Sequence, residues 1–160
     1  MNLINRIVLL IGRMRLKNIE FFKTHPKEVQ TKVFWSLIKK AQNTEWGRYH
    51  KYSGFKSIAD FQKNVPISRY EDIYPYIHRM MFGERNVLWP GFIKWFAKSA
   101  GTTNARSKYI PVSRASIKKI HFKGGKDVGL LYLKNHPGSG ILLGKNVAVP
   151  GSLEKMSKKG

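Results

Sequence analysis

The first hydrophobic pattern along the chain is typical of an amphipathic helix over residues 1–22. Five apolar residues recur at helical spacing and fall on one side of this segment: Leu3, Ile7, Leu10, Met14 and Phe21. Positive charge comes from Arg6, Arg13, Arg15 and Lys17. The pattern favours an N-terminal helix that packs on its own domain, and its alternative is a helix that binds a membrane surface or a partner.

A second helix is predicted to begin at Pro26, because a proline in the first turn loses no hydrogen bond there. Its apolar positions repeat every four residues through Val29, Val33, Leu37 and Ala41, and Phe34 and Ile38 widen the stripe. The pattern stops at residues 44–47. We expect this helix to face a core that also contains Trp35 and Trp46.

Two further helical segments are predicted between residues 57 and 83. Ser57 and Asp60 have the spacing of a helix cap, and so do Ser68 and Glu71. Pro75 should kink or split the second of these helices, and Gly83 should end it. Its last residues, Met80, Met81 and Phe82, are expected in the core.

From Asn86 onward β-branched and aromatic residues predict short strands at residues 87–89, 93–97 and 109–112. The last two strands flank a polar loop at residues 99–107, which indicates a hairpin. Ser113 then caps a final helix over residues 114–135. We therefore expect an α/β or α+β fold, with N-terminal helices, a sheet that carries the strand–loop–strand hairpin, and a helix.

Composition narrows the function classes. The chain of 160 residues has no cysteine, which excludes disulfide frameworks and thiol nucleophiles. Its 30 Lys and Arg exceed its 9 Asp and Glu, and the formal net charge is +21. Such an excess raises the expectation of an anionic partner such as a nucleic acid or a membrane surface. The chain contains no apolar run of transmembrane length, and we expect a cytoplasmic protein.

The segment from Lys98 to Lys108 has the chemistry of a phosphate-binding loop. Gly101 lets the backbone approach an anion, while Ser99, Thr102 and Thr103 offer hydroxyl donors. Successive amides of a tight turn can also bind an anion. On composition alone an ordinary hairpin loop is favoured, since these residue types are common in loops, and a phosphate-binding loop is the alternative.

Other motifs give weaker evidence of a functional site. Residues 138–145 lack the spacing of a Walker loop, and we expect a turn followed by a short strand there. The five histidines have no helical metal-ligand spacing, so no metal site is assigned. Asp127 and Glu84 are expected to have structural roles.

The run from Trp95 to Asn104, continued by residues 107–113, resembles the phosphate-loop motif of the auxin-responsive promoter or acyl-acid amido synthetase family. This family belongs to the adenylate-forming enzymes. Flanking segments occur in the same order as in its bacterial branch, at residues 65–67, 70–71, 75–77, 83–84, 88–90 and 121–127. The chain departs from the family pattern at Ala100, where a second serine is usual, and at residues 150–152.

The resemblance implies a ligase that uses ATP and Mg²⁺ to activate a carboxylic acid as an acyl-adenylate. An amine, often an amino acid, then attacks to form an amide. The residues that it places at the ATP phosphates are Ser99, Ala100, Gly101, Thr102, Thr103, Asn104 and Lys108. The resemblance identifies no catalytic residue within the chain.

Family members extend far beyond 160 residues, and their adenine, ribose and magnesium motifs lie downstream. We therefore expect residues 1–160 to form an incomplete N-terminal part of the large adenylate-forming domain, inactive alone and with exposed sheet edges and apolar surface. The alternatives are a small basic protein that binds nucleic acid, ranked second, and one that binds a membrane surface, ranked third.

Overall fold

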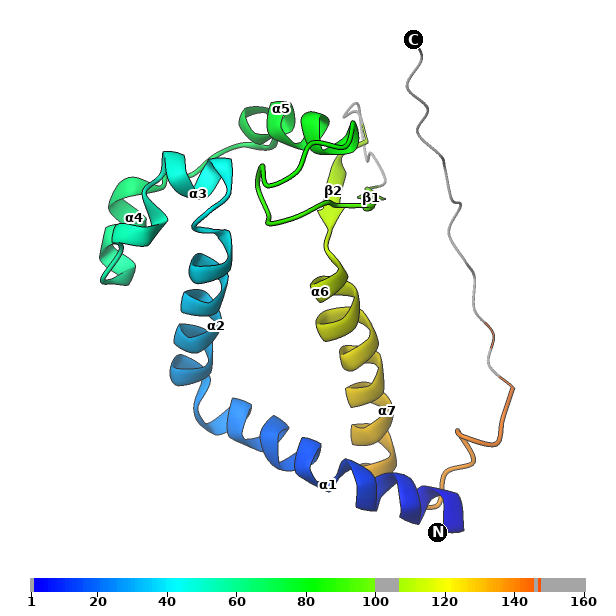
Figure 1. Ribbon diagram of the computed structural model, residues 1–160. Helices are drawn as coiled ribbons and strands as arrows, with labels where there is room; N and C mark the ends of the chain where they lie inside the picture. Colours follow the sequence, from blue (N-terminus) through cyan, green and yellow to red (C-terminus); the bar gives the residue numbers. More distant parts are fainter. Residues whose placement is uncertain (1, 100–106, 146, 148–160) are drawn as a thin grey trace. The chain divides into compact units, whose positions relative to one another are not determined.

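The computed structural model of the chain describes residues 2–99, 107–145 and 147. Its elements, in chain order, are α1 (Leu3–Thr24), α2 (Pro26–Ala41), α3 (Glu45–Tyr49), the 3₁₀ turn η1 (Tyr52–Gly54), α4 (Ile58–Asn64), α5 (Tyr70–Met81), β1 (Trp95–Lys98), β2 (Tyr109–Val112), α6 (Arg114–Ser116), the π-helical η2 (Ile117–Phe122) and α7 (Lys123–Asn135) (Figure 1). Helices with a small antiparallel sheet confirm the expected mixed class. The described residues divide into two compact units, 2–29 with 117–145 and 147, and 30–99 with 107–116.

In the first unit α1 packs on α7 (Figure 1). Gly12 permits the close approach, because a Cβ at this position would lie 2.3 Å from Leu130 Cδ1. Nearby, the Arg15 guanidinium donates two hydrogen bonds to the Asp127 carboxylate, at 2.7 and 2.6 Å. The structural role expected for Asp127 is therefore an ion pair between these helices, and its pKa is lowered by the hydrogen bond from Arg15.

The side of α1 that packs inward is not the predicted one. The buried face contains Asn5, whose amide nitrogen donates to the carbonyl oxygens of Pro137 and Ser139 at 2.9 and 2.7 Å. The five apolar residues of the predicted stripe are between 38% and 70% exposed. The expectation that this helix packs on its own domain is confirmed by its contact with α7, but the apolar stripe lies on the other side of the helix from Gly12 and Asn5.

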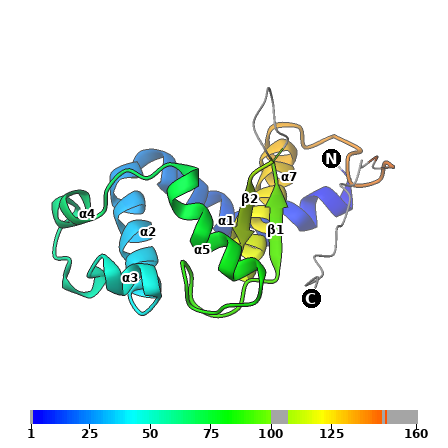
Figure 2. The same cartoon turned by 90° about the horizontal axis from the view of Figure 1, so that it is seen from above.

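In the second unit α2, α3 and α4 gather around one apolar cluster (Figure 2). Ile38, Ala41 and Tyr52 form its buried centre, and the partly buried side chains packed against them include Phe34, Trp35, Trp46 and Phe61. The packing roles predicted for Trp35 and Trp46 are confirmed. A second cluster contains Met80, Val87 and Ile93.

The predicted caps are right at α4 and wrong at α5. Ser57 Oγ accepts the N–H of Asp60 at 3.1 Å, and the Asp60 carboxylate accepts the N–H of Ser57 at 2.8 Å. At α5 the cap lies one residue later than predicted, where the Asp72 carboxylate accepts the N–H of Arg69 at 2.8 Å. The helix continues through Pro75 without a split. It ends at Met81, before Gly83 with φ +95°.

Residues 87–89 do not form the predicted strand. Asn86 and Gly91 have φ values of 58° and 81°, a backbone conformation that closes a turn instead of extending a strand. The Asn86 N–H donates to the carbonyl of Gly91 at 3.2 Å, and the Gly91 N–H donates to Asn86 Oδ1 at 2.7 Å. Val87 is nevertheless fully buried. Phe82, expected in the core, is 45% exposed.

The final helical stretch covers the predicted residues 114–135 as α6, η2 and α7. Ser113 Oγ accepts the N–H of Ser116 at 3.0 Å, which confirms the predicted cap. Residues 138–145 form turns, and the short strand expected there is not present.

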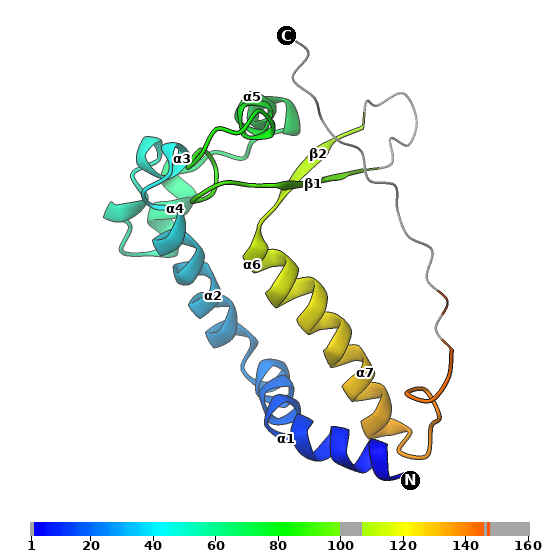
Figure 3. The ribbon, with the colours of Figure 1, turned by 45° about the vertical axis from the view of Figure 1, so that its right-hand side comes forward.

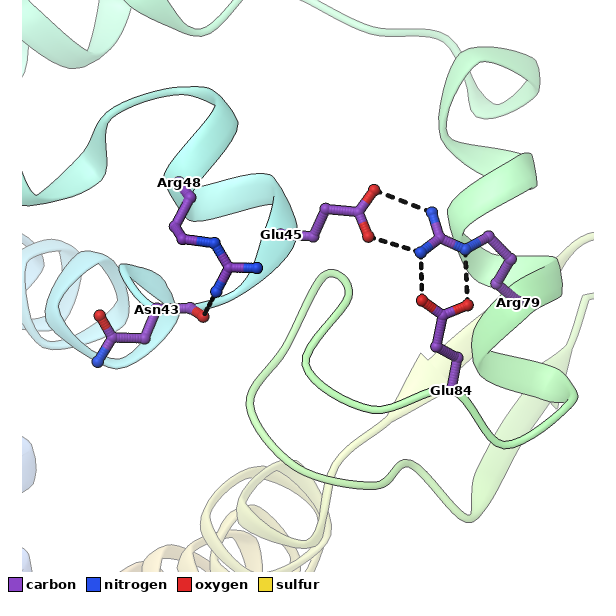
Figure 4. A network of polar contacts seen from close by, with 5 residues as sticks. All are labelled: Asn43, Glu45, Arg48, Arg79 and Glu84. Carbon is purple, nitrogen blue, oxygen red and sulfur yellow. Dashed lines mark hydrogen bonds and ion pairs between the residues drawn. The ribbon is translucent and has the colours of Figure 1, made fainter.

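A three-residue ion cluster joins α3 to α5 (Figure 4). Arg79 Nη1 and Nη2 donate to the Glu45 carboxylate at 2.9 and 2.6 Å. Its Nε donates to Glu84 Oε2 at 2.7 Å, and its Nη2 also bonds Glu84 Oε1. The structural role expected for Glu84 is thus one half of a clamp around a single guanidinium.

The clamp also sets the charge state of its members. Hydrogen bonds from Arg79 hold the pKa of Glu45 and of Glu84 below their ordinary value. The same bonds, which Arg79 donates to Glu84 and to Glu45, raise the pKa of Arg79, and the bonds to Glu84 have the larger effect. Because the two carboxylates bind protons more weakly in the folded state, their contribution to stability is present above about pH 4.5 and is lost as pH falls.

Replacement of Gly47 by alanine should destabilise the second unit by about 2–3 kcal/mol. A Cβ at Gly47 would lie 2.0 Å from the carbonyl oxygen of Ala41, a backbone atom that cannot swing away. The matched control is Gly54→Ala, where a Cβ meets nothing within 4 Å. Urea unfolding followed by tryptophan fluorescence measures both variants. Equal midpoints for the two would contradict this account.

Arg79→Lys keeps the charge of the clamp but loses its forked geometry, and should lower the thermal unfolding midpoint by about 2–4 °C at pH 7. The difference from wild type should shrink as pH falls below about 4.5, where the two carboxylates of the unfolded chain begin to accept protons while those of the folded protein are still ionised. Arg48→Lys is the control, because the Arg48 guanidinium donates to the carbonyl of Asn43 (Figure 4). Circular dichroism melts across pH 3–8 test this, and a constant difference would count against the clamp.

Candidate phosphate-binding hairpin

β1 and β2 form the predicted strand–loop–strand hairpin (Figure 3). The strands are antiparallel, and the register runs from Trp95 opposite Val112 to Lys98 opposite Tyr109. Phe96 on β1 packs against the buried cluster of Met80, Val87 and Ile93. Phe96 therefore holds the first strand of the hairpin against the end of α5 and the turn that follows it.

The two ends of the loop meet at Ser99 and Lys108. The Ser99 N–H donates to the carbonyl of Lys108 at 2.9 Å, and the Lys108 N–H donates to Ser99 Oγ at 3.1 Å. The structure thus brings together the first and last residues of the predicted phosphate site. The other five, Ala100, Gly101, Thr102, Thr103 and Asn104, lie outside the described residues.

Helix α5 contacts β2 at the end of this loop. Tyr109, the first residue of β2, donates its N–H to the Tyr70 hydroxyl at 2.8 Å. Lys108 Nζ lies 5.1 Å from the centre of the Tyr70 ring and 3.9 Å from Glu71 Oε1. Tyr70 and Glu71 are not among the predicted site residues, because their contacts with Lys108 join residues 37 or more positions apart along the chain.

The two described residues of the predicted phosphate site, Ser99 and Lys108, carry groups that suit an anion. The Ser99 hydroxyl accepts one hydrogen bond from Lys108 and keeps its own proton for donation to a ligand. Lys108 adds an ammonium group on a side chain that is 45% exposed. A loop closed by such a pair has a donor and a cation at its base, as a phosphate site needs.

Magnesium, which the resemblance implies, stays a prediction. Within residues 2–99, 107–145 and 147, no three His, Asp or Glu side chains gather as metal ligands. We therefore assign no magnesium ligand to this part of the chain. Nor does any described helix have the length and apolarity needed to cross a membrane. The cytoplasmic location stays a prediction.

The sequence profile of the GH3 family N-terminal domain matches residues 15–158. The putative indole-3-acetic acid-amido synthetase GH3.9 of Arabidopsis thaliana is 35% identical over 98 residues, which cover 60% of this chain and 16% of that protein. The probable indole-3-acetic acid-amido synthetase GH3.11 of Oryza sativa subsp. japonica is 28% identical over 102 residues, which cover 62% of this chain and 17% of that protein.

A solved structure of the GH3.15 acyl acid amido synthetase superposes with a TM-score of 0.70 at 27% identity and covers 81% of this chain. The match takes in 23% of that protein. The chain thus spans less than a quarter of the relatives that it matches. The bacterial affiliation stays a prediction, because the two named relatives are plant proteins. The resemblance inferred from the loop and its flanks is confirmed, and the chain belongs to the GH3 family through the N-terminal domain.

Proposed function

We propose that this chain supplies the ATP phosphate-binding loop of an acyl acid amido synthetase. The observation that carries the proposal is the closed base of the hairpin, where Ser99 and Lys108 bond to each other across the loop. The residues between them have the composition of a phosphate loop, and the family membership supports the same use.

In the proposed reaction a carboxylate oxygen attacks the α-phosphorus of ATP, and pyrophosphate leaves with the bonding electron pair. The product is an acyl-adenylate. An amine, for example that of an amino acid, then attacks the acyl carbon, loses a proton and expels AMP to give the amide. The loop would hold the phosphates in line, and Lys108 would offset negative charge that develops on the leaving group.

The substrates are proposed by class. Both named curated relatives are called indole-3-acetic acid-amido synthetases, so their acid carries an acetic acid group on an aromatic ring. We propose a carboxylic acid and an amine or amino acid for the enzyme to which this chain contributes. Because the chain spans so little of its relatives, we propose that residues 1–160 alone do not catalyse the full reaction.

Gly101→Asp should weaken ATP binding by about tenfold or more, because it places a carboxylate where the loop would meet phosphates. The measurement is a titration of the 160-residue chain with ATP by calorimetry. The matched control is Gly54→Asp, which adds the same charge at an open position. An unchanged ATP affinity in Gly101→Asp would overturn the assignment of this loop.

Nucleic-acid binding is the second candidate, and one observation favours it. Four lysines of the first unit are exposed along η2 and the start of α7: Lys118, Lys119, Lys123 and Lys126. Residues 85–126 contain ten Lys or Arg and no Asp or Glu. Such a stretch can neutralise the phosphates of a nucleic acid and release their counterions.

If this candidate is right, the chain should bind a fluorescent single-stranded DNA with an affinity that falls at least tenfold between 50 and 200 mM salt. Replacement of the four lysines by glutamine should reduce that salt dependence. Fluorescence anisotropy measures both. Weak binding at 50 mM salt, or an affinity that the replacement leaves unchanged, would remove nucleic acid as the partner.

A further inference from the structure

The Tyr70 hydroxyl contacts the outer edge of the hairpin at the residue that follows the loop. It accepts the N–H of Tyr109 at 2.8 Å, and it lies 3.4 Å from the carbonyl oxygen of the same residue, to which it donates. One hydroxyl therefore satisfies both backbone groups of Tyr109. Tyr70 is held in place as the first residue of α5, directly after the cap formed by Arg69 and Asp72.

The ladder explains why Tyr109 is free to make these bonds. In an antiparallel sheet, opposite residues alternate between pairs that are hydrogen-bonded to each other and pairs that are not. The Ser99 N–H bonds the carbonyl of Lys108, so the next pair, Lys98 and Tyr109, is of the second kind. The amide and carbonyl of Tyr109 consequently point away from β1. The Tyr70 hydroxyl takes the place that a neighbouring strand would occupy, and it fixes where β2 begins.

The side chain of Lys108 lies over the same turn of α5. Its ammonium is 5.1 Å from the centre of the Tyr70 ring, and it is 3.9 Å from Glu71 Oε1. The Lys108 and Glu71 side chains are 45% and 72% exposed. A pair this long and this exposed is weak, and a ligand with several negative charges can replace the carboxylate.

We propose that Tyr70 is a positioning residue for the phosphate loop, and that Glu71 holds the Lys108 ammonium until ATP phosphate oxygens take the place of its carboxylate. The proposal rests on the proposed function. Tyr70 sets the start of β2 and supports the lysine with its ring. Glu71 holds the cation against the first turn of α5 while ATP is absent, and its carboxylate competes with the nucleotide for the same ammonium.

The replacement of the Glu71 carboxylate by ATP phosphates predicts changes in ATP affinity that a purely structural role of Glu71 does not produce. Glu71→Gln should tighten ATP binding by roughly threefold, because the phosphates no longer compete with a carboxylate. Lys108→Met should weaken it by about tenfold, since the side-chain length remains but the charge is lost. In the double variant the gain from Glu71→Gln should disappear. Calorimetric titration of the 160-residue chain with ATP measures all four proteins.

The positioning role is tested by Tyr70→Phe, which keeps the ring beneath Lys108 and removes the hydroxyl. Amide hydrogen exchange at Tyr109, followed by NMR, should become at least tenfold faster, and ATP binding should weaken. Tyr74→Phe removes a hydroxyl one turn further along α5 and is the control. Unchanged exchange at Tyr109 in Tyr70→Phe would overturn the role of Tyr70.

The outcomes separate the two proposals. If Gly101→Asp abolishes ATP binding while Glu71→Gln leaves it unchanged, the proposed competition between Glu71 and ATP is wrong and the assignment of the phosphate loop is supported. An equal gain in ATP affinity from Glu71→Gln with and without Lys108 would also overturn this competition, because it would indicate general repulsion between the Glu71 carboxylate and ATP. If the wild-type chain does not bind ATP at millimolar concentration, the proposed function and the competition between Glu71 and ATP both fail. The exchange rate at Tyr109 then still decides the role of Tyr70.

Discussion

A two-stranded antiparallel hairpin is marginally stable in water, so the loop between β1 and β2 depends on what supports the strands. Helix α5 supplies that support at two levels. Met80, near its end, forms the buried cluster against which Phe96 packs. Tyr70, at its beginning, bonds the backbone of Tyr109. One helix therefore fixes both a face and an edge of the hairpin.

The support of α5 itself comes from the ion clamp and the turns around it. Arg79 ties the helix to Glu45 at the start of α3 and to Glu84 beyond its own end. The first amides of α3 are satisfied by neighbouring carbonyls, since the N–H of Glu45 donates to Asn86 and that of Trp46 donates to Val87. Polar contacts thus connect α3, the turn closed by Asn86 and Gly91, and α5 to one another.

The sequence predicted the helices well where a local signal sets their limits. Pro26 opens α2, Ser57 with Asp60 opens α4, and Ser113 opens the last helix. It failed where tertiary contacts decide. The apolar residues at 87–89 predict a strand, but the turn closed by Asn86 and Gly91 buries Val87 without a partner strand. The wider apolar stripe of α1 predicts the buried side, but Gly12 allows a closer approach on the opposite side. In the candidate site, Ser99 and Lys108 follow from the local motif, whereas the contacts of Lys108 with α5 depend on how the hairpin docks.

The outward side of α1 has a consequence for the behaviour of the chain in solution. Leu3, Leu10, Ile11 and Met14 are each at least two-thirds exposed there, which is a surface on which two copies can associate. The net charge of +21 opposes such encounters through mutual repulsion. At 1 M salt this repulsion is screened beyond about 3 Å, while contact between apolar side chains is not weakened. High ionic strength, the usual remedy for a basic protein that binds anionic contaminants, therefore removes the barrier that keeps these helices apart.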